Sequence, residues 1–135
     1  MQEYMPNLWA VLGAVAAKFI LGGLWYSPIL FLKPWMKSTG IKEKEMKKGM
    51  PKAMVAEVVG GFLMAVVLAH AIHYAQAQGV VQGMVVGFFN WLGFVAVVLT
   101  GGVFYEKKPW NWYWITAGYF LVSLLIMGAI LVTWA

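Results

Sequence analysis

The 135-residue sequence lacks cysteine, arginine and aspartate altogether, and charged residues make up only 11% of it. Without cysteine, the chain can form no disulfide, no thiolate metal site and no cysteine nucleophile. It also lacks a Ser–His–Asp set, a phosphate-binding glycine loop and a pair of carboxylates at a spacing useful for acid–base chemistry. We therefore expect a protein that is not an enzyme and that binds no cofactor.

Apolar residues dominate what is present. They make up 62% of the sequence, and its mean hydropathy is +0.75. A soluble domain of this size could not bury that much apolar surface, because most of its residues lie near the outside. A membrane-spanning helix needs about 20 apolar residues, and four such stretches occur, at residues 8–26, 53–75, 83–105 and 112–134. The sequence predicts a single all-α membrane domain over residues 1–135, a four-transmembrane-helix antiparallel bundle.

The lysines are distributed unevenly between the linkers of this bundle. Linkers 27–52 and 106–111 hold nine of the ten lysines, whereas linker 76–82 and both ends of the chain hold none. Basic loops stay on the cytoplasmic side of a membrane, so we expect both lysine-rich linkers in the cytoplasm and both termini outside. This clustering of a net charge of +5 favours contact with anionic lipid headgroups rather than with nucleic acid. The lysines expected at the headgroups are Lys42, Lys44, Lys47, Lys48 and Lys52.

Prolines indicate how the first linker is bounded. Pro28 cannot continue a helix and should end the first span, while Pro51 suits the first turn of the second span. Between them, residues 37–50 fit either a short interfacial helix or a solvated loop.

The two halves of the chain share short motifs. The first span ends in GGLWY at residues 22–26, and the third ends in GGVFY at residues 101–105. Residues 59–72 of the second span also align with residues 117–130 of the fourth. These matches fit a tandem repeat of one helix hairpin about an axis normal to the membrane. Chance similarity between apolar segments fits them equally well.

Small residues recur in the spans at helical spacing. Helices in lipid associate through close packing and polar contacts, because lipid tails are as apolar as leucine. One clear match is GMVVG, in which Gly83 and Gly87 form a GxxxG pair. Such residues serve contacts within one bundle or a homo-oligomer interface, and the sequence is compatible with both.

Three polar residues, Lys18, Glu57 and Asn90, lie inside the predicted spans. Lys18 is ten residues, or roughly 15 Å, before Pro28, the proline that should end its span, and this is too far for its side chain to reach the headgroups. An unpaired lysine at this depth costs about 2.5–3.5 kcal/mol. We therefore expect Lys18 to face a carboxylate, a carbonyl or water.

Glu57 is the only acidic residue within the spans and lies about 6 Å from Lys18 along the membrane normal. Long side chains could close this gap, although helical side chains lean toward their own N-terminus, which directs these two apart. Direct pairing, a water-bridged contact and a contact between subunits all fit the sequence. Asn90 either hydrogen-bonds to a neighbouring helix or extends a polar path with the other two.

His70 and His73 lie near the outer end of the second span. Their three-residue spacing places them on neighbouring helix faces, and two histidines can ligate a metal or a haem. The chain has no third histidine, cysteine or aspartate to complete such a site. They are weak metal candidates, and we expect interfacial histidines bonded to carbonyls or water and no metal.

Two segments resemble a known family. Residues 7–36, which include WYSP, carry one signature, and residues 87–131, which include WLGFV, AGY and MGAIL, carry the other, so the resemblance covers nearly the whole chain. The chain resembles the small bacterial membrane proteins grouped as domain of unknown function 1761 (DUF1761). The resemblance implies a four-span integral protein of the bacterial cytoplasmic membrane with no established activity. Lys18 and Thr116 depart from the family pattern, which has an apolar residue and an asparagine there.

Two functions fit these features. The first is a non-catalytic membrane component, either a self-associating scaffold or an accessory subunit. The alternative is an oligomeric transporter or channel for small solutes or ions, with Lys18 and Glu57 on its polar path. A lysine at this depth suits an anion better than a cation. A polar path through the assembly would favour transport, whereas a fully packed bundle would favour the scaffold.

Overall fold

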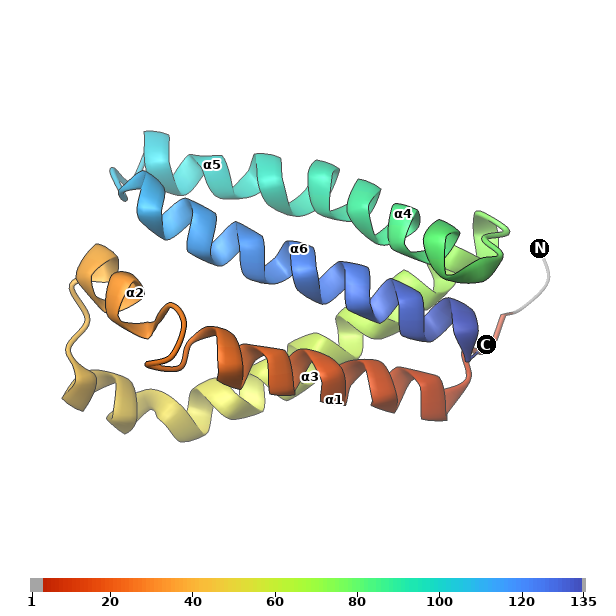
Figure 1. The fold of residues 1–135 in the computed structure, drawn as a ribbon, viewed down its shortest axis with the longest axis horizontal. Helices are drawn as coiled ribbons and strands as arrows, with labels where there is room; N and C mark the ends of the chain where they lie inside the picture. Colours follow the sequence, from red (N-terminus) through yellow and green to blue (C-terminus); the bar gives the residue numbers. More distant parts are fainter. Residues whose placement is uncertain (1–3, 135) are drawn as a thin grey trace.

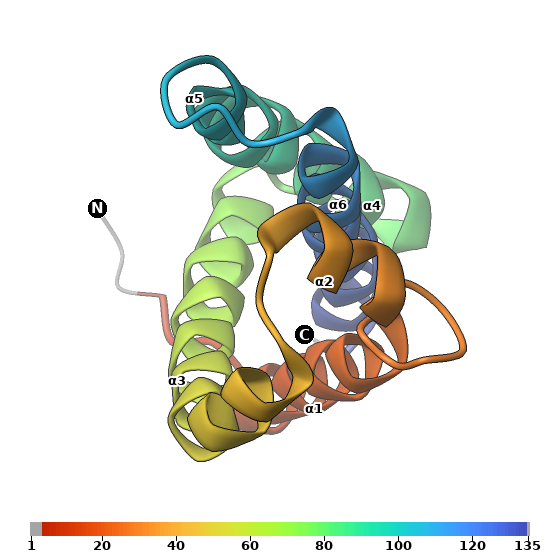
Figure 2. The same cartoon turned by 90° about the vertical axis from the view of Figure 1, so that its left-hand side faces the viewer.

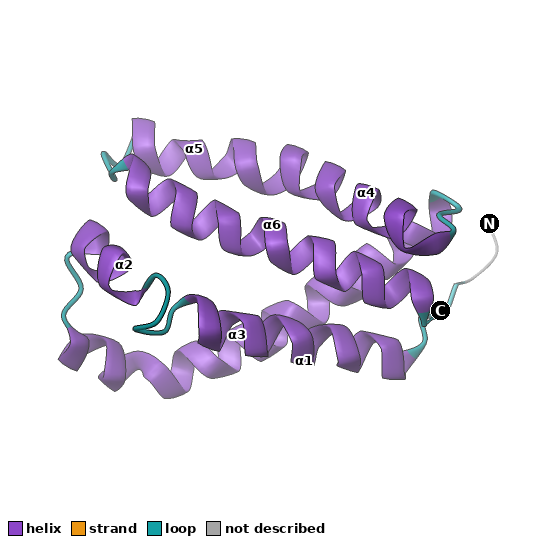
Figure 3. Ribbon diagram, viewed as in Figure 1, coloured by secondary structure: helices purple, strands orange, loops and turns teal. Residues whose placement is uncertain are grey.

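The computed structural model describes residues 4–134, and every regular element within this range is a helix. The elements are α1 (Leu8–Trp25), α2 (Leu32–Thr39), α3 (Glu43–Tyr74), α4 (Gly79–Trp91), the π-helix η1 (Leu92–Ala96), α5 (Val97–Phe104) and α6 (Trp110–Thr133). Helix α4, η1 and α5 follow one another without a break and form one rod (Figure 3). The prediction of an all-α chain is confirmed.

Four of these helices are long and apolar enough to cross a membrane. They are Leu8–Trp25, Glu43–Tyr74, Gly79–Phe104 and Trp110–Thr133. Each of them overlaps one of the four predicted spans. Together they have the length and composition expected of a helical membrane protein.

Helix α6 lies at the centre of the arrangement. It contacts α1, α3 and the α4–α5 rod, and Figure 2 shows it between that rod on one side and α1 with α3 on the other. The side-chain amide of Asn7 donates to the carbonyl of Trp134 at 3.1 Å, so the start of α1 and the end of α6 lie at the same end of the molecule (Figure 1).

Small side chains allow α1, α3 and α6 to pack closely near this end. Ala10 and Ala14 of α1 and Ala65 and Ala69 of α3 are at most 3% exposed, and they share one apolar cluster with the fully buried Met127 of α6. The spacing of four residues places each alanine pair on one face of its helix. Without larger side chains on these faces, the helix backbones can approach one another.

Helices α4 and α6 approach most tightly at glycines. A methyl group on Gly83 would lie 2.5 Å from the carbonyl oxygen of Gly128, and one on Gly87 would meet the backbone of Leu124. The GxxxG pair is therefore buried in a contact within the chain. An interface between copies would have to use other residues.

A π-helix, which no sequence pattern predicted, interrupts the third span. The wider turns of η1 replace the regular α-helical ladder over Leu92–Ala96. Tyr113 of α6 donates its hydroxyl to the carbonyl of Ala96 at 2.8 Å, and Trp91 donates its indole N–H to the carbonyl of Ala117 at 2.8 Å. These two bonds fasten both sides of the π-helix to α6.

The expectation that Pro51 begins the helix of the second span is wrong, whereas α1 does end before Pro28, at Trp25. Helix α3 begins at Glu43, and Pro51 lies inside it. An acidic residue in the first turn interacts favourably with the helix dipole, and Glu43 also pairs with Lys47 at 3.2 Å. Proline removes one backbone donor from a helix, and because Pro51 is exposed, water can replace that bond.

Residues 27–52 are consequently helical over much of their length rather than one loop. Helix α2 ends at Thr39 and is capped by Gly40, whose φ of 74° favours glycine, and α3 begins three residues after this cap. Residues 37–50 are therefore neither a separate short helix nor a solvated loop throughout, the two alternatives left open by the sequence, because they hold the end of α2 and the start of α3. With 32 residues, α3 is about 48 Å long, which exceeds the roughly 30 Å of a bilayer core.

Candidate functional site

Lys18 and Glu57 meet inside the bundle. The ammonium group of Lys18 lies 2.5 Å from Oε1 of Glu57. The side chain of Lys18 is only 3% exposed, whereas that of Glu57 is 31% exposed. Of the three arrangements that the sequence left open, the structure has the direct contact within one chain. The attraction between the two opposite charges reduces the free-energy cost of burying them.

Lys18 and Glu57 meet although each side chain leans toward the N-terminus of its own helix, which directs the two apart. The path of the Lys18 side chain past α3 explains how the pair forms. A Cβ atom added to Gly61 would lie 3.6 Å from Cδ of Lys18. Gly61 follows Glu57 by one turn of α3, or about 6 Å along the helix axis. The stem of Lys18 therefore passes α3 at Gly61, where no side chain blocks it, and its ammonium group turns toward Glu57.

Tyr119 of α6 completes the cluster. Lys18 Nζ donates to the hydroxyl of Tyr119 at 3.2 Å, and this hydroxyl donates to Oε1 of Glu57. The carbonyl of Lys18, 3.1 Å from the hydroxyl, is a second acceptor for it. Sequence reasoning missed Tyr119. The signal that could have found it is a tyrosine in the middle of an apolar span, because a buried tyrosine hydroxyl needs a hydrogen-bond partner.

Ring faces and a glycine shape the space around this cluster. The ammonium group of Lys18 lies 5.0 Å from the ring centre of Tyr119 and 5.5 Å from that of Phe120, within the range of cation–π attraction. A methyl group on Gly22 would lie 2.8 Å from the hydroxyl of Tyr119. Glycine at this position therefore leaves room for the tyrosine. We call Lys18, Glu57 and Tyr119 the ion-pair cluster.

Two further hydroxyls lie on the same face of α6. Thr116 and Ser123 flank Tyr119 at distances of three and four residues, which aligns all three along the helix. The hydroxyls of Thr116 and Ser123 are buried, and they neighbour the hydroxyls of Tyr26 and Tyr119, respectively. Beyond Ser123, buried Met127 and Leu131 continue this side of α6 with apolar groups. The row of polar groups thus stops inside the bundle.

Asn90 does not join the ion-pair cluster. It lies on α4, and its Nδ2 donates to the carbonyl of Val86 in the same helix at 2.8 Å. This is its only hydrogen bond in the described part of the chain, so the structure gives it no bond to a neighbouring helix. Among residues 4–134 of one chain, no hydrogen bond links Asn90 to Lys18 or Glu57.

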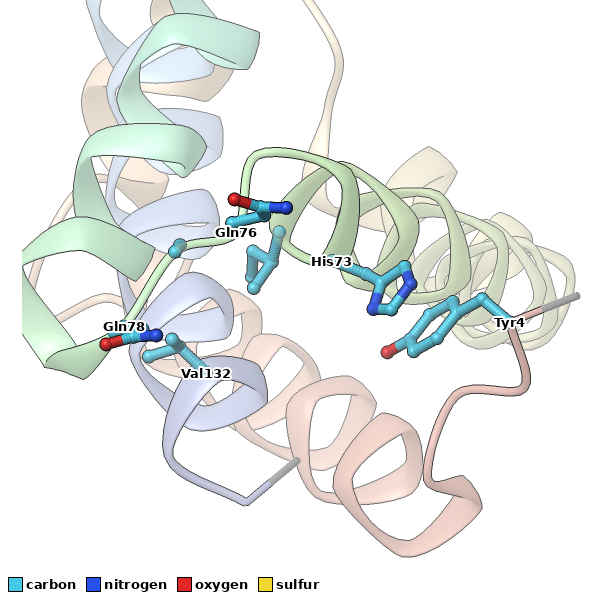
Figure 4. Close-up of a pocket in the computed structure, with 7 residues that line it drawn as sticks. Tyr4, His73, Gln76, Gln78 and Val132 are labelled. Atoms are coloured by element: carbon cyan, nitrogen blue, oxygen red, sulfur yellow. The ribbon is translucent and has the colours of Figure 1, made fainter. Parts of the chain in front are cut away.

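The two histidines lie with Tyr4 at the end of the bundle that holds the termini. His70 bonds through Nδ1 to a carbonyl of its own helix at 2.7 Å, and the ring of His73 stacks on that of Tyr4 with centres 4.0 Å apart. Figure 4 shows Tyr4, His73 and Gln76 around a pocket of about 340 Å³. Burial raises the pKa of the Tyr4 hydroxyl above its ordinary value. In the described chain, no group of three His, Cys, Asp or Glu could hold a metal.

All five lysines expected at lipid headgroups are exposed. They are Lys42, which precedes α3, and Lys44, Lys47, Lys48 and Lys52 within it. Between them, Met46 and Met50 are partly buried. The first turns of α3 therefore present a mostly charged surface.

Four helices that are long and apolar enough to cross a membrane, three of which share an ion pair between them, are features of the class of helical membrane proteins. A family model described as "Protein of unknown function (DUF1761)" matches residues 9–132. The chain therefore belongs to this family, as its motifs predicted. Comparisons with curated proteins and with solved structures gave no match.

The two motifs behind the family resemblance both contact the central helix. Trp25 of WYSP donates its indole N–H to the carbonyl of Ile115 at 3.0 Å, and Trp91 of WLGFV donates to the carbonyl of Ala117 at 2.8 Å. The two accepting carbonyls are two residues apart on α6. The motifs thus fasten α1 and α4 to α6 at the same level, next to the ion-pair cluster. A family of unknown function assigns no activity to these residues.

Proposed function

We propose that this protein is a non-catalytic scaffold or accessory subunit of the bacterial cytoplasmic membrane, and that copies of it self-associate. The helices run antiparallel in this proposal, with both termini outside. The observation that carries it is the ion-pair cluster, which joins α1, α3 and α6 through hydrogen bonds between its own members. Charges that pair with one another hold helices together, and the paired ammonium group of Lys18 is not free to bind a solute.

The packing next to the cluster supports a structural role. Val11 and Ala14 of α1 and Met127 of α6 are at most 1% exposed. Apolar side chains fill this part of the bundle. The row of polar residues on α6, Thr116, Tyr119 and Ser123, therefore does not continue toward the C-terminal end of that helix. A closely packed bundle suits a scaffold, whereas a channel requires an open pore with groups that replace the hydration shell of the ion at its selectivity filter.

Charge and length support the orientation and a contact with anionic lipid. The first ten residues of α3, Glu43–Lys52, carry four lysines, and α3 is longer than a bilayer core is thick. In the proposed orientation this segment leaves the membrane on the cytoplasmic side. Each lysine near an anionic surface contributes about 1 kcal/mol of attraction.

The surface around Glu57 supports self-association. Glu57 keeps 31% of its side chain exposed, and polar groups that face lipid are costly. On the same helix Ala53 and Ala56 are exposed, and a methyl group on Gly60 would meet nothing within 4 Å. A second copy packed here would shield the carboxylate, and the small residues would let two α3 helices approach closely.

Reconstitution tests the proposal. In lipid nanodiscs, we expect native mass spectrometry to find more than one copy per assembly. In vesicles loaded with chloride-sensitive or pH-sensitive dyes, we expect no flux above that of protein-free vesicles. A single copy per nanodisc would contradict self-association, and flux that is lost in Lys18→Met but kept in Lys44→Met would contradict a purely structural role.

A small-anion transporter is the second candidate, and one observation favours it. The exposed edge of Glu57 connects the buried ammonium group of Lys18 to the surface of the bundle. If the bond between them opens, Lys18 becomes a buried cation that can pair with an anion. Anion flux that depends on Lys18, with Lys44→Met as the charge-matched control, would select this function over the scaffold.

A further inference from the structure

A groove separate from the ion-pair cluster lies between α3 and the α4–α5 rod. Figure 1 shows α3 and the rod joined at one end and diverging toward the other, with α6 beside them. The groove has a volume of about 480 Å³. Its walls include Leu63 and Val67 of α3, Asn90 of α4, Phe94 and Val95 of η1, and Leu124 of α6. The size, and a mostly apolar lining with one polar group, are typical of a site for a small lipid-soluble molecule.

Asn90 is the polar group of this groove. It lies near the middle of the rod, eleven residues after Gly79 and fourteen before Phe104. A side-chain amide offers two N–H donors and one carbonyl acceptor, and Asn90 uses a single donor, toward Val86. Its carbonyl oxygen and second N–H are therefore available to an occupant. In a hydrocarbon environment, such groups are costly unless they are paired.

The wall opposite α3 is formed by the π-helix. Single π-helical turns within α-helices occur frequently at functional sites. Phe94, in η1, is 76% exposed at the edge of the groove. The bond from Tyr113 to Ala96 holds the widened turn against α6. Helix α6 thus fixes the shape of this wall on one side, and the groove lies on the side of the wall that faces α3.

We propose that the groove binds a lipid-soluble molecule that carries one neutral carbonyl or hydroxyl group on a hydrocarbon chain, and that this group hydrogen-bonds to Asn90. A plain hydrocarbon chain would fill the groove but leave the amide unpaired, and so would an apolar helix from a second copy. The residues that line the groove carry no charge that could compensate an ionised ligand. This proposal is independent of the scaffold role.

The test compares two photoreactive probes, diazirine-bearing hexadecanol and the matching diazirine-bearing hexadecane, with the protein in nanodiscs. One neutral hydrogen bond corresponds to a preference of roughly two- to tenfold. We expect the alcohol to label residues 63–68 and 94–95 more than the alkane by about this factor. Asn90→Leu should remove the preference, whereas Thr100→Val, which removes a hydroxyl elsewhere on the rod, should keep it.

A second variant leaves Asn90 in place and fills the groove. Val67→Trp should reduce labelling by both probes, since Val67 lines the groove and is 64% exposed. Equal labelling by the two probes, or a preference that survives Asn90→Leu, would overturn the proposal. Absence of labelling by either probe would overturn it as well.

Discussion

Lys18 and Glu57 are separated by 39 positions in the sequence, yet their charged groups lie 2.5 Å apart, and Tyr119 from a third helix bonds to both. Helices in a membrane gain no hydrophobic driving force from meeting each other. Specific polar contacts and close packing must therefore decide which helices become neighbours and in which register. The ion-pair cluster does this for α1, α3 and α6 at once.

The first prediction concerns the coupling between the two charges. Lys18→Met leaves the carboxylate of Glu57 without its partner, and Glu57→Gln leaves the ammonium of Lys18 without its own. Breaking a fully buried pair costs about 3–5 kcal/mol, and because Glu57 is partly exposed we expect about 1–3 kcal/mol for each change. Both variants should still fold, and the double variant should recover most of the loss, as measured by thermal unfolding in detergent.

The control for this cycle is Lys44→Met, which removes the same charge from an exposed position of α3. It should leave the unfolding temperature unchanged. If the losses of the two single variants simply add in the double variant, the side chains are not coupled, and the contact contributes nothing to the fold.

The second prediction concerns the tyrosine hydroxyl. Tyr119→Phe removes a donor to Glu57 and an acceptor for Lys18, which should cost about 1–3 kcal/mol. Gly22→Ala should also destabilise the fold, because its methyl group would lie 2.8 Å from that hydroxyl. In the combined variant, the nearest remaining ring atom would be 3.3 Å from the new methyl group. Gly22→Ala should therefore lower the free energy of unfolding less in the Tyr119→Phe background than in the unchanged protein. Equal costs of Gly22→Ala in both backgrounds would contradict this geometry.

The sequence predicted the helices, and it offered the direct Lys18–Glu57 pair as one of three possible arrangements. Continuous apolar runs locate spans because lipid leaves no other way to satisfy a backbone. A lysine about 15 Å from the headgroups demands a partner, and Glu57 was the only acid within reach. Tyr119 was missed because an aromatic residue in an apolar span fits lipid contact, packing and hydrogen bonding equally well.

Two features, the π-helix and the groove, could not be predicted from the sequence, because they depend on a local change of helix pitch and on how two helices diverge. The π-helix at Leu92–Ala96 has no distinctive composition, and the groove beside Asn90 exists because α3 and the rod separate. Pro51 was assigned to the start of a helix, but it lies inside α3. Polar residues precede a proline both where it begins a helix and where it lies within a solvated helix, so the sequence did not distinguish the two. Distinguishing them requires knowing that charged side chains hold the helix upstream of the proline.

The third prediction concerns close packing between α4 and α6. Gly87→Ala places a methyl group against the backbone of Leu124, which cannot move aside as a side chain could. We expect the free energy of unfolding to fall by at least about 2 kcal/mol, which is within the range for strong overpacking of a core. Gly60→Ala is the matched control, because its methyl group would meet nothing within 4 Å. In a protein that is not self-associated, Gly60→Ala should leave the free energy of unfolding unchanged or raise it by up to about 1 kcal/mol, because alanine has the higher helix propensity.

The fourth prediction concerns the start of α3. Pro51→Ala restores a backbone N–H that can donate to the carbonyl of Lys47, and within a helix alanine is favoured over proline by about 3 kcal/mol. Hydrogen exchange over residues 43–51 should therefore slow, while thermal unfolding of the packed part of the bundle changes little. Pro34→Ala is the control, since Pro34 lies in the first turn of α2, where an N–H has no partner within the helix. Unchanged exchange in Pro51→Ala would show that α3 begins after the proline and that the lysines before it form a solvated loop.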